Sequence, residues 1–584
     1  MLHRIGTLTG LAACLLLAQS AAAQYTGVDI SSAVTAGPVI NAKNITSSPP
    51  KPAGNLKTEA GPHQFPELLP PMKHTGAPLE QIETTTPLAA VDAAQPRFRG
   101  FTGLTHLDQR FANGGNQFSH EPPDQGLAVG NDFVMEAVNC AINIYDVNGI
   151  VQLPRPLALT EIFGLPEEFN RTTGELHTSV GDPSCLFDPE TQRWFVIAWA
   201  QLNTPTGQPL RQSRLYLAVS QTSDPTGAYR TYVFNTTGTA DLDQAGPRVP
   251  DFPHFAVDRY GLYINWQEFA IDRNGNLDGF IGTAIVAMSK SDLINGGTRP
   301  PVQRFAIPFQ TGFEFRIWPA YIPPGQTPVL ANGGTEYFLS SNLGFDSFNQ
   351  IAVWALSNTS SLNSPNPNLH LKMTTVNTRV YHFPDFSVPQ KKGFHPLGES
   401  LGFPVADLDA GPDSISSCEY VNGHIWGTLS SAAKDSSGKT IEVADYFAFT
   451  PQITNGNLTA SLFTQGVIAA PGRFLMYPAI ALNKNNIGTI VFSLSSPNDY
   501  PSAAFVTVNG TLRSPIHISR EGNEPEDGFT CYPPFSDGVC RWGDYSAGAV
   551  NNVDQTSWTA TEYVPDINRS SQANWATYVT RFGP

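Results

Sequence analysis

Residues 185–200, CLFDPETQRWFVIAWA, read as two short apolar strands joined by a polar turn. The first apolar group ends at Phe187, and the turn that follows begins with Asp188 and Pro189. The second group, residues 194–200, holds aromatic, branched and small apolar side chains, which fit the surface of a β-sheet. Turn residues between two apolar groups predict a β-hairpin at this place.

The same hairpin pattern recurs along the chain. Further copies begin at Leu127, Phe255, Cys418, Ile480 and Gly548, and a weaker copy begins at Gly334. Successive copies start about 58 to 84 residues apart, which leaves room in each interval for two more strands such as RLYLAVS or AAFVTVNG. Each unit therefore predicts a four-stranded sheet, and such sheets repeated around an axis form a β-propeller.

We predict an all-β protein with a single β-propeller over residues 98–584, most simply with seven four-stranded blades. Six or eight blades remain open because the copy at Gly334 is weak. The segment NWATYVTRF at 574–582 would close the ring by pairing beside residues 98–104. Two β-sandwich domains are the alternative fold, but they do not predict one hairpin type at near-even intervals.

The start of the chain has the pattern of a secretory signal peptide. Residues 1–23 contain a short basic start, an apolar run and three alanines before Gln24, so we expect a secreted protein, either extracellular or periplasmic. Residues 11–14 also resemble the box read by the lipoprotein pathway, but the apolar run continues past Cys14, which favours secretion over a lipid anchor. Residues 24–97 are rich in Pro, Ala and Thr and predict a disordered linker.

The composition argues against several classes of partner. A net charge of −16 and a pI near 5.2 argue against nucleic acid, because phosphate binding needs a basic surface. After the signal peptide, no stretch reaches the roughly 20 apolar residues that span a bilayer. We expect a monomer without a membrane span, whose partner is a glycan, an extracellular polymer or a surface ligand.

The cysteines suit an oxidising compartment. Cys531 and Cys540 bracket a short loop with Pro-Pro and Asp-Gly sequences, so they are predicted to form a disulfide. Cys185 and Cys418 each lie in an apolar strand-like run, which is typical of buried thiols. The pairing of Cys140, Cys185 and Cys418 stays open.

An aspartate stands a few residues ahead of most of the hairpins. These residues are Asp124, Asp182, Asp251, Asp413 and Asp544. The first strand of each propeller blade lines the central channel, so equivalent positions of different blades meet at one mouth. The sequence therefore predicts an acidic ring there. The alternative is structural, because an aspartate beside Gly or Pro also caps turns or fastens one blade to the next.

Arginines and aromatic residues accompany the aspartates. Arg248 and Arg541 each stand three residues before an aspartate, and Arg473 precedes the blade that lacks one. Nearby positive charges allow closely spaced carboxylates to stay ionised. Flat faces for stacking against sugars are expected from Trp318, Tyr477, Trp542 and Tyr545. The predicted ligand-binding residues are Asp124, Asp182, Asp251, Asp544, Arg248, Arg541, Trp542 and Tyr545, and His254 could reach the same mouth.

A second polar motif suggests a cation. Oxygen-bearing side chains alternate at Asp272, Asn274, Asn276 and Asp278, which is the spacing that a calcium ion needs in a loop. The same letters also form Asn-Gly and Asp-Gly turns without metal. No HExxH or CxxC motif and no phosphate-cradling glycine loop occurs, so zinc proteases and nucleotide-dependent enzymes have no support.

Five motifs together resemble a family of large secreted bacterial proteins, mostly uncharacterised. They are PPDQGLAVGNDFVMEAVNCAINIYDVNG (122–149), GDPSCLFDPETQRWF (181–195), AVSQTSDPTGAY (218–229), PDFPHFAVDRYGLY (250–263) and RWGDYSAGAVNNVDQTSWTATEY (541–563). The resemblance implies a β-propeller of the sialidase-type superfold and no established reaction. The chain departs from sialidases because it lacks their repeated S-x-D-x-G-x-T-W boxes.

Three functions follow as hypotheses. The first is a non-catalytic propeller that binds a glycan, polymer or surface ligand at the acidic and aromatic channel mouth, and the sequence favours it. The second is a sialidase-like glycoside hydrolase that uses two channel carboxylates, one of them with a raised pKa. The third is a structural or adhesive cell-surface module. The fold alone does not decide among them.

Overall fold

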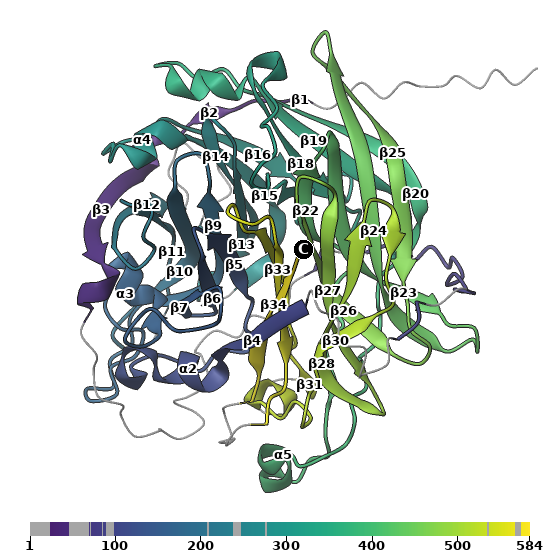
Figure 1. The fold of residues 1–584 in the computed structure, drawn as a ribbon. Helices are drawn as coiled ribbons and strands as arrows, with labels where there is room; N and C mark the ends of the chain where they lie inside the picture. Colours follow the sequence, from purple (N-terminus) through teal and green to yellow (C-terminus); the bar gives the residue numbers. More distant parts are fainter. Residues whose placement is uncertain are drawn as a thin grey trace, which may run out of the picture.

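The computed structural model describes residues 24–45, 69–70, 72–83, 86–88, 98–206, 209–236, 247–274, 277–533, 537–566 and 574–583. These residues form a seven-bladed β-propeller (Figure 1). Each blade has at least four strands, so the predicted fold class and blade number are confirmed. The predicted signal peptide, residues 1–23, lies outside the described residues. No helix in the described part of the chain is long and apolar enough to cross a membrane.

The innermost strand of each blade packs against the innermost strands of its two neighbours, so these strands form a closed ring around the central channel. In chain order they are β5 (Gly126–Gly130), β9 (Ser179–Asp188), β13 (Arg248–Val257), β17 (Trp318–Pro319), β22 (Ile415–Val421), β26 (Phe474–Leu482) and β32 (Ala547–Val550). Their starts face one end of the channel.

The second and third strands extend each blade outward in antiparallel order. The second strands are β6 (Phe133–Val138), β10 (Arg193–Asn203), β14 (Gly261–Ile271), β18 (Thr335–Ser340), β23 (His424–Lys434), β27 (Ile487–Ser496) and β33 (Ser557–Tyr563). The third strands are β7 (Ala141–Asp146), β11 (Pro209–Ser220), β15 (Leu277–Ser289), β19 (Ser347–Ser357), β24 (Thr440–Thr454), β28 (Asp499–Asn509) and β34 (Ala576–Phe582).

The fourth strands form the outer rim. They are β8 (Leu157–Ala158), β12 (Ala228–Asn235), β16 (Val302–Pro308), β20 (His370–His382), β25 (Asn457–Ile468), the pair β29 (Leu512–Arg513) and β30 (His517–Arg520), and β4 (Phe98–Thr105). β4 pairs with β34 in an antiparallel register that sets Phe98 opposite Phe582. The last blade therefore combines both ends of the propeller sequence, as predicted.

Apolar side chains between neighbouring blades make up the core. Between the second and third blades, Phe195 and Leu217 meet Phe255 and Ile264 in one buried cluster. All nine residues of β26 are buried, because this strand has another blade on each side. Complete burial of a large apolar side chain stabilises the fold by about 1.5–3 kcal/mol. Face-to-face packing of blades is thus the main source of stability.

The fourth blade differs from the prediction. Its hairpin at Gly334 forms β18 and β19, the second and third strands, whereas the innermost strand is β17. β17 contains only Trp318 and Pro319, so it leaves no alternating pattern in the sequence. The predicted start of this repeat is one strand too late for that reason.

Residues 24–45 also differ from the predicted disordered linker. They form β1 (Gln24–Tyr25), β2 (Val28–Asp29) and β3 (Val34–Asn41), which add a fifth strand to the fourth, third and second blades. β3 follows the rim beside β12 (Figure 1). The open backbone edges of the outer strands explain the difference, because they offer hydrogen bonds that the segment cannot make alone.

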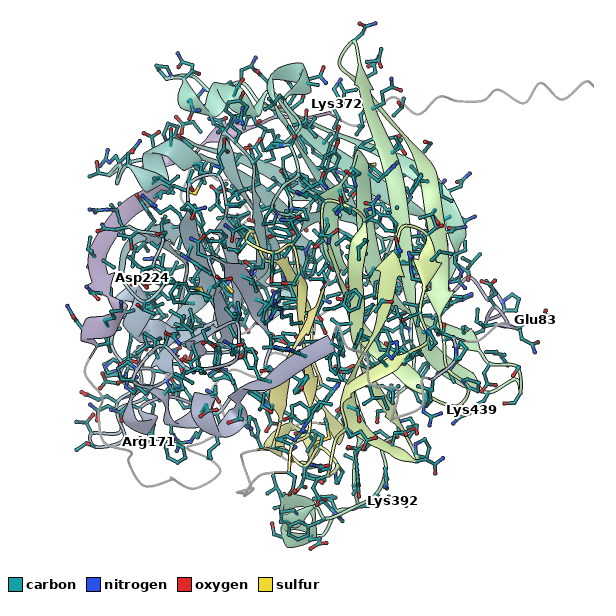
Figure 2. The ribbon with its side chains drawn as sticks, viewed as in Figure 1. Glu83, Arg171, Asp224, Lys372, Lys392 and Lys439 are labelled. Carbon is teal, nitrogen blue, oxygen red and sulfur yellow. A yellow bond between two sulfur atoms is a disulfide. The ribbon has the colours of Figure 1, made fainter. Side chains whose placement is uncertain are left out.

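An exposed ion pair also ties this segment to the rim. Lys43 Nζ lies 2.7 Å from Asp224 Oδ2, and Figure 2 labels Asp224 on the side of the molecule where β3 runs. Both side chains are about half exposed, so the pair contributes at most about 1 kcal/mol. Most of the attachment therefore comes from the strand pairing and from the burial of Val34.

Loops at one end of the channel build a cap. β21 (Asp407–Leu408) and β31 (Val539–Cys540) pair in parallel, and the disulfide Cys531–Cys540 fastens the loop before β31. α2 (His106–Phe111), α5 (Pro396–Leu401) and β31 lie at the same lower end in Figure 1, whereas α3 (Leu159–Phe163) and α4 (Lys290–Ile294) lie at the side. The predicted disulfide is confirmed. The thiols of Cys140, Cys185 and Cys418 are free and buried.

Candidate functional site

A cavity of about 700 Å³ lies under this cap, at the end of the channel where the innermost strands begin. Its wall includes Asp124, Asp182, Asp251 and Asp544, which come from four different blades. Arg541 lines the same cavity. The structure thus brings four of the predicted aspartates and one predicted arginine together. The volume falls in the range of about 300–1,000 Å³ that small-molecule sites occupy.

Unusual backbone angles turn several side chains into the cavity. Asp124, Asp182, Phe252 and Arg316 have φ angles of 48°, 48°, 54° and 47°, within or just before their innermost strands. This left-handed region is uncommon for residues other than glycine and costs about 1–3 kcal/mol each. All four residues line the cavity. Left-handed positions from four blades therefore meet at one end of the channel.

Hydrogen bonds fix two of the aspartates. Asn139 Nδ2 donates to Asp124 Oδ2 over 2.6 Å, while Asn139 Oδ1 accepts from the backbone N–H of Asp182 over 2.7 Å. Trp199 Nε1 donates to Asp182 Oδ2 over 2.8 Å, and the backbone N–H of Phe252 donates to the same oxygen over 3.1 Å. The first three blades are therefore joined by one polar network at the cavity wall.

The carboxyl groups of Asp182 and Asp251 both line the cavity, and each influences the pKa of the other. Burial raises the pKa of Asp251 well above its usual range, and the charge of Asp182 and its hydrogen bond raise it further. Burial also raises the pKa of Asp182, but the bond from Asp251 and the Trp199 donor oppose that shift. These two buried carboxyl groups therefore hold a proton more readily than exposed aspartates do.

Asp124 is a second acid with a raised pKa. Its pKa lies well above the usual range because of burial first, and then because of the charges of Asp544 and Asp182. Its Oδ1 atom is buried without a hydrogen-bond partner. A protonated oxygen there could donate to a ligand in the cavity.

Asp544 has a different environment, because it lies between two guanidinium groups. Arg541 Nη2 is 2.5 Å from Asp544 Oδ2, and Arg316 Nη2 is 3.5 Å from Oδ1. The Arg316 guanidinium also lies 3.9 Å from the centre of the Phe252 ring, a cation–π contact. Arg541 Nη1 lies 3.7 Å from Asp409 Oδ2. Asp544 is therefore paired with two positive charges.

Arg248 does not belong to the cavity, contrary to the prediction. Its Nη1 forms a buried ion pair with Glu268 Oε2 at 2.7 Å, and Arg304 holds the other oxygen of Glu268 at 2.6 Å. Asp251 faces the cavity, and side chains alternate along a strand, so a residue three positions earlier points to the opposite face. The spacing that suggested a partner for Asp251 therefore places Arg248 between blades.

The predicted aromatic residues also lie outside the cavity wall. Trp542 is fully buried in the apolar cluster of the cap. Tyr545 is buried in the channel, where its hydroxyl donates to the carbonyl of Pro183 over 3.1 Å and its ring packs against His254. Burial lowers the pKa of His254 to about 3, so it is neutral. The short loops of the cap hold these rings inside the protein. The sequence pattern does not predict this orientation.

The structure also places three further residues that the sequence analysis considered for the channel mouth. Asp413 is fully buried outside the cavity, and Asp409 lines it instead, four residues earlier and across a turn at Gly411 with φ 67°. Tyr477 is buried, and Arg473 Nε pairs with Asp499 Oδ2 at 2.9 Å. The geometry of the turns determines where these side chains lie, and the spacing of the aspartates in the sequence does not predict that geometry.

The proposed calcium loop is described only in part. Asp272 Oδ1 accepts the backbone N–H of Asn274 over 2.8 Å, and Asp278 lies in β15. Asn276 lies outside the described residues. The calcium site stays a prediction.

Several cavity residues escaped the sequence analysis. Arg316 stands two residues before β17, but this strand has only two residues and so hides the repeat. Trp199 lies in β10 and was interpreted only as a core residue of a hairpin. Glu121 lines the cavity, and burial raises its pKa to about 7 although Thr530 and Phe529 donate hydrogen bonds to it. Glu121 directly precedes the quoted PPD motif, which was the available signal.

No family model and no curated protein matches the chain. Among solved structures, the chain is similar to the Trypanosoma rangeli sialidase in complex with sialic acid, with 10% identity and a TM-score of 0.31. The match covers 76% of this chain and 57% of the sialidase. A protein of unknown function from Dyadobacter fermentans (10% identity, TM-score 0.30) matches over 68% of this chain and 94% of its own. A GH43 β-1,3-galactosidase with galactodeoxynojirimycin (10% identity, TM-score 0.28) matches over 59% and 94%. These likenesses concern the fold alone.

Proposed function

We propose that the protein is a glycoside hydrolase whose active site is the acidic cavity, with Asp251 as the general acid and Asp544 as the carboxylate partner. One observation carries the proposal: two carboxyl groups line one cavity in opposite electrostatic environments. Asp251 keeps a proton, whereas Asp544 is paired with two arginines. Glycoside hydrolysis requires such a pair, one acid to protonate the leaving group and one carboxylate.

The roles follow from these protonation states. Asp251 donates its proton to the glycosidic oxygen while the bond from that oxygen to the anomeric carbon breaks. Asp544 then either accepts a proton from the attacking water or bonds to the anomeric carbon until water displaces it. Asp182, held by Trp199 Nε1, receives the hydrogen bond of Asp251 and orients its proton.

The cavity favours a neutral or basic sugar over an acidic one. Its wall carries seven aspartates and one glutamate against two arginines, and both arginines already contact aspartates. A ligand carboxylate would meet a net negative wall, which like-charge repulsion disfavours. Phe252, Phe386 and Trp199 supply apolar faces against which a sugar ring could stack.

The confirmed disulfide Cys531–Cys540 supports an oxidising compartment, in agreement with secretion. Non-catalytic glycan binding is the second candidate. The hydrogen bonds that fix Asp124 and Asp182 favour it, because a preorganised set of acceptors suits sugar hydroxyls without any reaction.

A screen of the purified protein against neutral, amino and acidic polysaccharides tests the proposal, with reducing-end release and calorimetric binding read on the same samples. We expect a neutral or amino glycan to be cleaved. Asp251→Asn should lower cleavage about 10²- to 10⁴-fold with little change in binding. Asp413→Asn is the control, because Asp413 is also a buried acid but lies outside the cavity. Binding without cleavage supports the second candidate, and neither binding nor cleavage contradicts both.

A further inference from the structure

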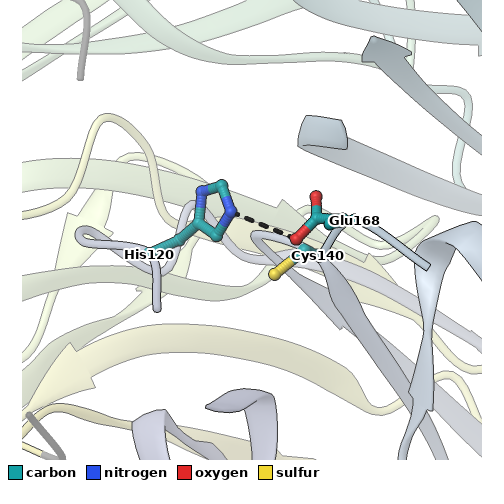
Figure 3. Close-up of side chains that lie close together, drawn as sticks. All are labelled: His120, Cys140 and Glu168. Carbon is teal, nitrogen blue, oxygen red and sulfur yellow. Dashed lines mark ion pairs between the residues drawn. The ribbon is translucent and has the colours of Figure 1, made fainter. Parts of the chain in front are cut away.

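A histidine, a cysteine and a glutamate meet at the edge of the cavity. The side-chain ligand atoms of His120, Cys140 and Glu168 all lie within 4.8 Å of one another (Figure 3). His120 precedes β5, Cys140 lies in the turn between β6 and β7, and Glu168 follows α3. Of the three, His120 lines the cavity. Nothing in the acid–base role of Asp251 and Asp544 uses this cluster.

The distance between His120 and Glu168 fits two ligands of one metal ion. His120 Nε2 lies 3.5 Å from Glu168 Oε2, and this buried nitrogen has no hydrogen-bond partner. Zinc bonds of about 2.0–2.2 Å to nitrogen and oxygen at a tetrahedral angle would set these two atoms about 3.4 Å apart. One ion between them would therefore satisfy the unpartnered nitrogen with little movement.

Neighbouring groups already orient the three side chains. The backbone N–H of Val180 donates to Glu168 Oε1 over 2.8 Å, and that of Phe118 donates to Oε2 over 3.3 Å. Gln109 Nε2 donates to Cys140 Sγ over 2.6 Å, while Gln109 Oε1 accepts the backbone N–H of His120 over 3.3 Å. Metal sites commonly have such outer partners, which hold the ligands in position.

The backbone at Cys140 is a further sign that the sulfur matters. Its φ angle is 57°, in the left-handed region where glycine would fit without strain. The side chain is buried, so the thiol is shielded from solvent oxidants. Cys140 lies at a strained turn, and a histidine and a carboxylate lie beside it. Together the three side chains offer the nitrogen, sulfur and oxygen ligands that zinc accepts.

We propose that His120, Cys140 and Glu168 bind one zinc ion at the edge of the cavity. A thiolate and a carboxylate together balance the charge of a divalent cation, and the neutral imidazole completes three ligands. Three protein ligands leave one tetrahedral position for a water molecule. The zinc site is distinct from the predicted calcium loop at residues 272–278, and it does not depend on the hydrolase proposal.

Metal content of the full-length secreted chain tests this assignment. The protein is stripped with a chelator, reloaded with zinc chloride, desalted and analysed for metal per chain. We expect one zinc ion per chain and at least about a tenfold loss of zinc affinity in Cys140→Ser and in Glu168→Gln. Cys185→Ser is the matched control, because Cys185 is also a free buried thiol but belongs to no such cluster among the described residues.

Cobalt loading of the unmutated protein gives a readout that does not depend on how the variants fold. Cobalt in this site should show a thiolate-to-metal charge-transfer absorption, and calcium should not displace it. Wild-type protein that retains no zinc, or zinc bound as tightly by Cys140→Ser as by wild type, overturns the proposal. Cobalt uptake without the thiolate band overturns it as well.

Discussion

At the scale of single residues, local backbone conformation and position along the strand separate the side chains that reach the cavity from those that do not. Asp124, Asp182 and Arg316 enter it from left-handed positions, whereas Arg248, within a regular strand, points between blades. Trp199 and Trp542 show the same contrast among aromatic residues. Trp199 reaches the cavity and holds Asp182, but Trp542 fills the apolar cap.

Substitution of the two tryptophans should therefore separate function from stability. Trp542→Ala empties a fully buried site and should lower the free energy of unfolding by about 3–5 kcal/mol. Trp199→Phe keeps most of the ring but removes the donor to Asp182, so the main loss should be in glycan cleavage or binding. Urea denaturation and the glycan assay on both variants check this. A Trp199→Phe protein with wild-type glycan activity would argue against its role at the site.

At the scale of elements, the N-terminal strands act as an added rim. β3 presents Val34 to the core with no exposed surface, whereas Val39 in the same strand is 45% exposed. Composition alone could not predict these strands, because their hydrogen-bond partners are outer strands about 190 to 350 residues away in the sequence. The prediction of a disordered linker did not take into account the open backbone edges of these outer strands.

A matched pair of substitutions in β3 measures this attachment. Val34→Asp would bury a charge against the second and third blades and should destabilise the protein by several kcal/mol. Val39→Asp should stay within about 0.5 kcal/mol of wild type, because its side chain faces solvent. Denaturation curves and limited proteolysis report both effects. Equal behaviour of the two variants would mean that β3 is not docked in solution.

Short elements also limited what the sequence could predict about the site. Repeated hairpins were sufficient to predict seven blades, the closing pair of β4 and β34, and the shared position of Asp124, Asp182, Asp251 and Asp544. The two-residue β17 left no pattern, so Arg316 was missed. Cap loops have no repeat at all, and the roles of Asp409 and Trp542 depend on their turns.

At the scale of the whole molecule, buried acids make stability depend on pH. Burial raises the pKa of Glu121, Glu136 and Asp445 to about 7, from ordinary values of 4.5, 4.5 and 3.8. Between the ordinary pKa of each group and the raised value near 7, the folded protein holds protons that the unfolded chain releases. Linkage then requires the free energy of unfolding to fall as pH rises through this window.

We therefore expect the urea midpoint to be higher at pH 5 than at pH 8. Each unit of pKa shift corresponds to about 1.4 kcal/mol, so three such groups should produce a measurable change. Glu136→Gln keeps the shape of the neutral acid and should weaken the pH dependence. A midpoint that rises steadily from pH 5 to pH 8 would contradict the assignment of these groups as protonated in the folded state.

The central claim is that Asp251, which has a raised pKa, and Asp544, which is paired with two arginines, act together on a glycan in the cavity. The most direct measurement is the pH dependence of kcat/KM for the cleaved glycan, in wild type and in Asp251→Asn. The account predicts that wild-type kcat/KM falls at high pH as Asp251 loses its proton, and that Asp251→Asn loses both the activity and this fall. A variant with the rate and pH profile of the wild type would contradict it.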